Sequence, residues 1–301
     1  MQFDAHCIDC LIHRHFKLAL AHQDGEKANA YLRDVMQLML EAPAGVSAPW
    51  LTGAFTKAYA KYWPGVDAYA ALKQESNDLV LELLPRIQPL VEQAADPLAM
   101  ALKFSRTGNF LDFGILTPDV AQAALWDAVE HTPDLELDPE TYSHFVQDLQ
   151  QARRLVILGD NAGEIAFDTL LVQQLQRQYP QLEIQYCVRG ENTLNDATRA
   201  DAAYVGMDRL CSILDNGSAI SGTELDYAGP ALRQALAEAD VILSKGSGNL
   251  ESLAGCGLNV YYIFMCKCRR VSKILGCPNM SGQFLRERAL PPLEPLVGSL
   301  D

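Results

Sequence analysis

The stretch Arg154-Leu-Val-Ile-Leu-Gly159, continued by Asp160-Asn-Ala-Gly-Glu-Ile-Ala-Phe-Asp168, decides the fold class of this chain. A short apolar run that ends in glycine and precedes a helical pattern predicts a strand, a loop and a helix in that order. Similar runs occupy Leu182 to Val188, Asp240 to Ser244 and Asn259 to Met265. Uninterrupted apolar runs of this length are typical of strands buried on both faces, so they predict a doubly wound, mostly parallel Rossmann-like α/β sheet.

The first half of the chain has a helical pattern instead. Apolar residues recur three and four apart in stretches such as Ala30 to Leu40 and Leu79 to Val91. We therefore expect residues 1–150 to form a helical subdomain that supplies a wall of the substrate pocket, and residues 151–301 to form the α/β domain that carries the chemistry. Prolines are expected near the helix ends, where a missing N–H is tolerated; they are Pro43, Pro49, Pro64, Pro85, Pro97, Pro118 and Pro133.

The composition excludes several classes of protein. Acidic residues outnumber basic ones 38 to 24 and the formal net charge is -14, which argues against a nucleic-acid partner. A phosphate site on such a chain needs local positive charge from a metal, Lys or Arg. Residues Met1 to Cys10 lack the pattern of a secretion signal, and no apolar segment is long enough to span a bilayer, so we expect a cytoplasmic protein without a membrane partner. The oligomeric state is not indicated.

The densest chemical signal is the pair Asp160 and Asn161, which follows the first predicted strand. Carboxylate and carboxamide oxygens are hard ligands that suit Mg²⁺ or Mn²⁺, and the affinity order also admits Co²⁺ or Ni²⁺. The same residues are common as helix caps and turn residues, and for an isolated pair that interpretation is the better one. Here the pair lies where doubly wound sheets bind their ligands, which favours a site.

Two further motifs follow predicted strands. Arg189-Gly-Glu-Asn-Thr-Leu-Asn-Asp-Ala-Thr198 presents Asp196, and a neighbouring strand end would bring it beside Asp160 to complete three oxygen ligands. Ser244-Lys-Gly-Ser-Gly-Asn-Leu-Glu251 places Lys245 before a glycine-rich turn whose N–H groups can approach an anion. The second motif has neither the Walker A order nor a complete dinucleotide fingerprint. Taken singly, each is more often a cap or a tight turn.

Together the motifs resemble the DUF89 family of metal-dependent phosphatases, also called the damage-control or ARMT-like family. The resemblance rests on Gly159-Asp-Asn-Ala-Gly-Glu164, on Asn195-Asp196 and on Ser244-Lys-Gly-Ser-Gly-Asn249. Weaker matches are Gly108-Asn-Phe-Leu-Asp-Phe113 and Asn216-Gly-Ser-Ala-Ile-Ser-Gly-Thr223, so the likeness runs from about Cys7 to Cys268.

The resemblance implies a role for each matching residue. Asp160, Asn161 and Asp196 would bind one divalent cation, and Lys245 would hold the transferring phosphate. Asn109 and Asp112 would line the pocket from the helical side. The remaining substrate contacts are expected from the glycine-rich turn, at Gly246, Gly248 and Asn249.

Two cysteine pairs raise a separate question. Cys7 and Cys10 form a Cys-x-x-Cys, which resembles the N-terminus of the compact, prokaryotic-type members of the family, and Cys266 and Cys268 form a second pair. Four thiolates would suffice for a structural zinc site. We favour reduced, buried cysteines without metal, because cysteine packs readily as a small apolar residue.

The expected activity is phosphomonoester hydrolysis of a small phosphorylated metabolite, such as a sugar phosphate or a damaged phosphometabolite, by a metal-activated water. Glu164 is a candidate to orient or deprotonate that water, although a role at the start of the helix is equally compatible. Asp160 is an alternative covalent nucleophile, but the Asn that follows it favours metal binding. The alternative functions are an S-adenosylmethionine-dependent carboxyl methyltransferase and a non-catalytic sugar-phosphate-binding protein.

Overall fold

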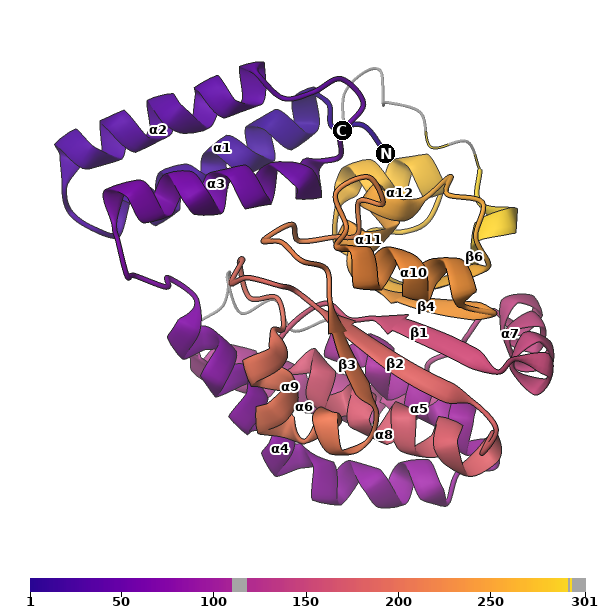
Figure 1. Ribbon diagram of the computed structural model, residues 1–301. Coiled ribbons are helices and arrows are strands. Elements are labelled where there is room, and N and C mark those ends of the chain that lie inside the picture. Colours follow the sequence, from indigo (N-terminus) through magenta and orange to yellow (C-terminus); the bar gives the residue numbers. More distant parts are fainter. Residues whose placement is uncertain (110–117, 292, 294–301) are drawn as a thin grey trace.

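A central sheet organises the fold (Figure 1), in a computed structural model that describes residues 1–109, 118–291 and 293. The six strands have the order β3-β2-β1-β4-β5-β6, in which β1 to β5 are parallel and β6 runs antiparallel to β5. This arrangement confirms the expected α/β class. The strands are β1 (Arg154–Leu158), β2 (Glu183–Val188), β3 (Ser212–Asp215), β4 (Val241–Lys245), β5 (Val260–Cys266) and β6 (Ser281–Arg286).

The four predicted strands correspond to the four central strands β1, β2, β4 and β5. The strands at the two edges, β3 and β6, were not predicted. Both are only partly buried and carry polar residues, so neither shows the continuous apolar run that marks a central strand. An edge strand has a neighbour on one side only, and its sequence is correspondingly less constrained.

Helices cover both faces of the sheet. Alternate residues of β1 point to opposite faces of the sheet. Leu155 and Ile157 pack in the core that the sheet shares with α4 to α9, whereas Val156 and Leu158 pack against α10 to α12. The two layers lie above and below the sheet in Figure 1. The helices are α4 (Ala70–Glu92), α5 (Pro97–Gly108), α6 (Pro118–His131), α7 (Pro139–Gln151), α8 (Glu164–Gln178), α9 (Arg199–Val205), α10 (Pro230–Glu238), α11 (Gly246–Leu253) and α12 (Arg269–Leu275).

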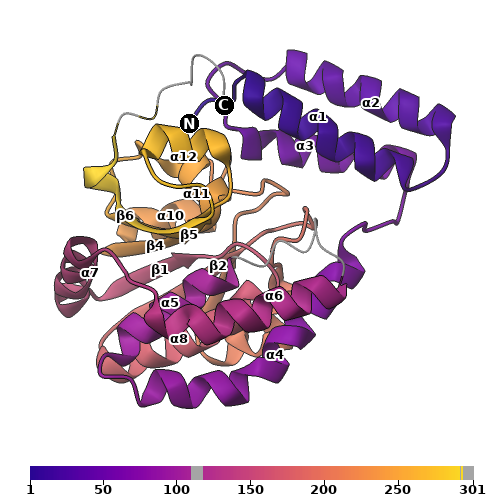
Figure 2. The same cartoon turned by 180° about the vertical axis from the view of Figure 1, so that it is seen from behind.

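The first three helices, α1 (Ala5–Leu20), α2 (Gly25–Leu40) and α3 (Ala48–Tyr62), form a separate unit, which Figure 2 shows beside the layer of α11 and α12. Their apolar cluster is distinct from both sheet cores and includes Tyr31 and Phe55. The helices of the first half thus fall into two groups, since α4 to α7 share a core with the sheet.

One expectation about the helices was wrong. Pro85 was expected near a helix end, yet Pro85 and Pro89 both lie inside α4. A proline in a helix removes one backbone hydrogen bond and strains the preceding turn. Here the buried face of α4, with Val80, Leu83 and Ile87, packs into the core with α8, so burial outweighs the local cost.

None of the helices within the described residues is long and apolar enough to cross a membrane.

Candidate active site

The candidate site lies at the carboxyl ends of β1 and β4, which are neighbours in the sheet. The chain passes from β1 to β2 and β3 on one side, whereas β4 and β5 extend on the other. The strand order therefore reverses between β1 and β4, and doubly wound sheets bind ligands at such a point. Asp160 follows the end of β1 and Lys245 ends β4.

The backbone brings Asp196 beside Asp160. The Ala197 amide donates to the carbonyl oxygen of Asp160 at 2.7 Å, and Asn161 and Asp196 form an isolated antiparallel bridge. The Asn161 side chain donates from Nδ2 to Asp160 Oδ2 at 2.9 Å. The three residues expected as metal ligands thus lie together, because β1 and β2 are adjacent and end at the same edge of the sheet.

A buried arginine that the sequence analysis did not identify joins the two carboxylates. Arg189 is 1% exposed; its Nε lies 2.5 Å from Asp196 Oδ2 and one terminal nitrogen lies 3.4 Å from Asp160 Oδ1. Its other terminal nitrogen donates to the carbonyl of Gly222 and to Asn249 Oδ1. The sequence feature that could have identified Arg189 is its position directly after β2, which matches the position of Asp160 near the end of β1.

Ser221 holds Asp196 from another loop. Its hydroxyl donates to both carboxylate oxygens of Asp196 at 2.8 Å. Ser221 belongs to the weaker family match that ends at Thr223, and the Thr223 hydroxyl donates to Asn249 Oδ1 at 2.8 Å. That match therefore contained a signal for these two contacts.

Asn109 reaches the site from the end of α5. Its Nδ2 donates to Asp160 Oδ2 at 3.0 Å and to Glu164 Oε2 at 2.8 Å, and its Oδ1 accepts from the Met265 amide at 2.9 Å. The helical half therefore contacts the carboxylates directly. Asp112, expected beside Asn109, lies outside the described residues.

Lys245 is completely buried behind these residues. Its Nζ lies 2.6 Å from Glu164 Oε1 and 2.8 Å from Asp168 Oδ1, and it donates to the Ser105 carbonyl at 3.1 Å. Burial lowers the pKa of the Lys245 ammonium, but the negative charges of Asp168 and Glu164 have the larger effect. The pKa of Lys245 is therefore raised. Lys245 therefore fixes two carboxylates in this structure, and its contact with a phosphate stays a prediction.

The glycine-rich turn packs against the same carboxylates. A Cβ atom at Gly246 would lie 2.0 Å from Asp160 Oδ2, and one at Gly248 would lie 2.4 Å from the Ser221 carbonyl oxygen. Asn249 is fully buried and donates to the carbonyls of Gly159 and Lys245. These contacts explain why the turn needs small residues, and the predicted contacts of Gly246, Gly248 and Asn249 with substrate stay untested.

The site carries more negative than positive charge. Among the described residues, the four carboxylates Asp160, Glu164, Asp168 and Asp196 form ion pairs with two cations, Arg189 and Lys245. Burial, followed by the charges of Asp196 and Glu164, raises the pKa of Asp160 to about 8 against the opposing effect of the nearby cations Arg189 and Lys267. A divalent cation would offset this excess charge.

The donor atoms also fit a hard cation. Asn161 Nδ2 donates to Asp160 and Glu164, which fixes the orientation of the amide. No described residue donates a hydrogen bond to Asn161 Oδ1, so this oxygen is available beside the Asp160 and Asp196 carboxylates. Two carboxylates and one amide oxygen form the type of ligand set that Mg²⁺ and Mn²⁺ accept, with other positions for water or phosphate.

All eight cysteines are free thiols. Cys7 and Cys266 are buried, Cys268 is half-buried and Cys10 is exposed. Within the part of the chain that the structure describes, no group of three or more His, Cys, Asp or Glu side chains is arranged to hold a metal ion. The geometry thus lends no support to a zinc site at the cysteine pairs, which stays an untested alternative.

Comparison with known proteins points to one family. Residues 3–281 match the family model described as the damage-control phosphatase ARMT1-like domain. A damage-control phosphatase of Archaeoglobus fulgidus is 28% identical over 92% of this chain and 96% of its own length, and the damage-control phosphatase PH1575 of Pyrococcus horikoshii is 23% identical over 92% and 96%. The crystal structure of a DUF89 family protein (PH1575) from P. horikoshii has a TM-score of 0.81 at 20% identity and covers 95% of this chain and 99% of that chain.

Proposed function

Because this chain belongs to the damage-control phosphatase ARMT1-like family, we propose that it is a metal-dependent phosphatase that hydrolyses a small phosphorylated metabolite. The observation that supports the site best is the convergence of Asp160, Asn161 and Asp196 at the point where the strand order reverses. The relatives named as damage-control phosphatases cover more than nine-tenths of this chain, which supports the same reaction class.

In this proposal Asp160, Asn161 and Asp196 hold one divalent cation, and the ions to be compared are Mg²⁺, Mn²⁺, Co²⁺ and Ni²⁺. When bound, such a cation stabilises negative charge on a phosphoryl group and lowers the pKa of a bound water. Arg189 and Ser221 fix the Asp196 carboxylate, and Asn109 and Asn161 fix Asp160.

Glu164 is the proposed general base. Its Oε2 accepts hydrogen bonds from Asn109 and Asn161, and Asn161 in turn bonds Asp160, so the carboxylate adjoins the proposed ligands. Lys245, 2.6 Å from Glu164 Oε1, positions this carboxylate. The role requires that one Glu164 oxygen exchange an amide partner for a water when substrate binds.

Two other functions remain as alternatives in this proposal, an S-adenosylmethionine-dependent carboxyl methyltransferase and a non-catalytic sugar-phosphate-binding protein. The ligand set of two carboxylates and an amide has no evident use in methyl transfer, whereas phosphoryl transfer uses it directly. A binding protein would show the same affinity for phosphate esters without turnover.

The test is phosphate release from p-nitrophenyl phosphate and a panel of sugar phosphates. Protein stripped with a chelator is reloaded separately with Mg²⁺, Mn²⁺, Co²⁺ or Ni²⁺. Asp160→Asn and Asp196→Asn are compared with Asp208→Asn, which removes an equal charge from an exposed position. We expect release that depends on metal, a loss of at least about 100-fold in both site variants and wild-type activity in the control.

Release that persists after stripping, or that survives both site substitutions, would overturn the proposal. Tight binding of sugar phosphates without release would favour the binding protein, and transfer of a labelled methyl group from S-adenosylmethionine would favour the methyltransferase.

A further inference from the structure

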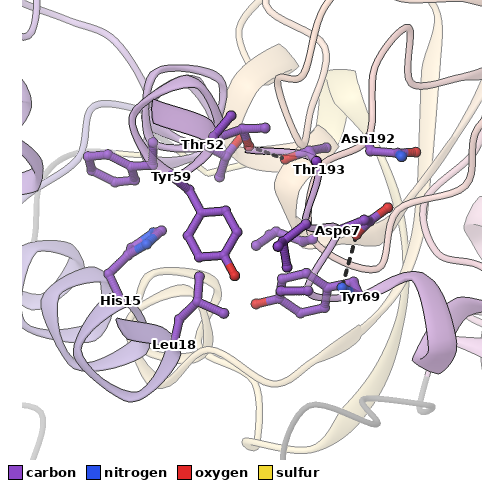
Figure 3. A pocket seen from close by; sticks show the side chains of 15 residues that line it. His15, Leu18, Thr52, Tyr59, Asp67, Tyr69, Asn192 and Thr193 are labelled. Atoms are coloured by element: carbon purple, nitrogen blue, oxygen red, sulfur yellow. Dashed lines mark hydrogen bonds between the residues drawn. The ribbon is translucent and has the colours of Figure 1, made fainter. Parts of the chain in front are cut away.

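A cavity of about 300 Å³ lies between the α1–α3 unit and the loop that leads to Asp196 (Figure 3). Its walls come from α1, from α3, from the connection at residues 65–69 and from residues 192–194. A cavity of this size is at the lower end of the range for small-molecule sites. It is separate from the cluster of Asp160 and Lys245, neither of which lines it.

Two short routes connect the cavity to Asp196. Thr193 lines the cavity, and its carbonyl oxygen accepts from the Asp196 amide at 3.1 Å. Thr52 lines it from α3, and its hydroxyl oxygen accepts from the Ser221 amide at 2.9 Å, while the Ser221 hydroxyl donates to Asp196. Thr193 alone therefore links the cavity wall to the proposed metal ligand Asp196 on one route, and Thr52 and Ser221 link them on the other.

The lining combines aromatic faces with polar atoms. The side chains of Tyr59 and Tyr69 extend into the cavity in Figure 3, and Phe55 lies edge-on to the His15 ring at 4.6 Å between ring centres. Burial, with a smaller effect from Arg14, lowers the pKa of His15 to about 4, so this ring is neutral near pH 7. Aromatic faces beside hydroxyl and carboxamide groups suit an organic group that carries several hydroxyls.

Among the described residues that line the cavity, Asp67 alone is charged at neutral pH, and neither lysine nor arginine is present. Asp67 Oδ1 accepts from the Tyr69 amide at 2.9 Å, and no described residue donates to its Oδ2. A second phosphate or a carboxylate placed in the cavity would meet this negative charge without a compensating cation from the described lining.

We propose that this cavity binds the organic part of the substrate and selects phosphomonoesters whose organic part is polyhydroxylated and carries no second negative charge. The inference rests on the proposed phosphatase function, because it places the phosphate at Asp160 and Asp196 and the hydroxylated group beyond residues 192–194. Asp67 is the specificity-determining residue, since it repels an additional anionic group.

The test uses two open-chain phosphomonoesters that differ at one carbon and serve as competing ligands. Sorbitol 6-phosphate ends in a hydroxymethyl group where 6-phosphogluconate has a carboxylate. Each competes with p-nitrophenyl phosphate on metal-loaded protein, and inorganic phosphate serves as a competitor that lacks an organic part. The variant is Asp67→Asn, which keeps the acceptor for the Tyr69 amide. The control is Asp127→Asn, which removes the same charge at a side chain 78% exposed on α6.

In the wild type we expect the Ki of 6-phosphogluconate to exceed that of sorbitol 6-phosphate by at least about tenfold, a difference of about 1.4 kcal/mol. Asp67→Asn should reduce the ratio to about threefold or less, whereas Asp127→Asn should keep it. The Ki of inorganic phosphate should be the same in the two variants.

A second variant tests the location. Ala60 lines the cavity from an exposed position on α3, so Ala60→Phe fills space without disturbing a core. It should raise the Ki of sorbitol 6-phosphate at least about tenfold and leave that of inorganic phosphate unchanged.

Equal Ki values in the wild type, or a ratio that Asp67→Asn leaves unchanged, would overturn the selectivity, and an inert Ala60→Phe would overturn the location. If no metal restores hydrolysis, the phosphatase proposal fails separately, and calorimetric titration of the same two compounds then tests the cavity. Tighter binding of sorbitol 6-phosphate than of 6-phosphogluconate supports the proposed selectivity, and equal or absent binding contradicts it.

Discussion

Gly246 shows how one residue controls the position of a proposed metal ligand. Its backbone has φ of +79°, a conformation that residues with a side chain rarely adopt. The backbone also passes so close to Asp160 that a Cβ atom would overlap its carboxylate. Glycine is therefore required twice at this position, once for its dihedral angle and once for space.

We predict that Gly246→Ala lowers kcat/KM by about 100-fold or more, because a carboxylate displaced by about 1 Å no longer holds its partners. The matched control is Gly255→Ala. Gly255 has φ of +89°, but a Cβ atom added there would meet no atom of the described residues within 4 Å, so it carries the backbone penalty without the clash.

Both substitutions should lower the free energy of unfolding by about 1 kcal/mol through the dihedral angle, and Gly246→Ala should lower it further through the overlap. Denaturant unfolding and steady-state kinetics measure the two effects. Full activity in Gly246→Ala, or an equal loss of activity in the control, would contradict the assignment.

The individual residues of the site were only partly predictable from the sequence. Asp160 follows β1 and Asp196 lies in the loop after β2, so the expectation that they meet depended on these two strands being neighbours, as they are in the structure. Arg189 directly follows β2, but apart from Asp196 its partners lie on other segments of the chain, and nothing local distinguishes a buried arginine from an exposed one. The burial of Lys245 between Glu164 and Asp168 depends on the packing of α8 against the sheet, which no spacing reveals.

At the scale of elements, the α1–α3 unit is held together by aromatic side chains around a buried histidine. His15 is 5% exposed and its Nδ1 lies 2.6 Å from the Tyr31 hydroxyl. The Phe55 ring packs against it from α3. The unit borders the cavity near Asp196, so its stability bears on the site as well.

Acid should destabilise this unit through His15. Its pKa is about 4 in the folded protein, below the ordinary value of 6.5, so the unfolded chain binds the proton more readily. The stabilisation from neutral His15 is therefore complete above about pH 6.5 and is lost as the pH falls toward 4. We predict a loss of about 2 to 3 kcal/mol over this window.

The measurement is denaturant unfolding in chelator at pH 7 and at pH 4.5, monitored by tryptophan fluorescence, since Trp50 lies in α3 and Trp63 directly follows it. His15→Gln keeps a hydrogen-bonding side chain without a titration in this window and should lose less stability on acidification. His144→Gln, at a side chain 41% exposed on α7, should behave as the wild type. An equal acid sensitivity of His15→Gln and the wild type would exclude His15 as the cause.

The sequence predicted those strands whose burial on both faces produces a mainly apolar run of residues. Strands β1, β2, β4 and β5 are covered on both faces and contain mainly apolar residues, although β2 includes Glu183 and Gln185. The edge strands β3 and β6 are held by one neighbour each and keep polar residues. The two prolines inside α4 show the opposite failure, in which tertiary packing overrides a local signal that favours a helix end.

At the scale of the whole molecule, the net charge of -14 opposes the approach of a phosphorylated substrate. The positive charge of Arg189 and Lys245 does not offset this effect at long range, because each is buried and paired with carboxylates. A bound divalent cation acts within the site, whereas the surface charge acts on the substrate during its approach.

Salt should therefore accelerate the encounter. The Debye length falls from about 30 Å at 0.01 M to about 8 Å at 0.15 M ionic strength, which screens the surface charge from an approaching phosphate ester. At saturating metal we predict that kcat/KM for sorbitol 6-phosphate rises by about two- to tenfold over this range, while kcat stays constant because the bound state is screened little. Sodium chloride and potassium acetate at equal ionic strength serve as mutual controls against a specific anion effect. A kcat/KM that falls with both salts would mean that a local positive potential governs the approach, supplied by the metal or by a cation near the site such as Lys267.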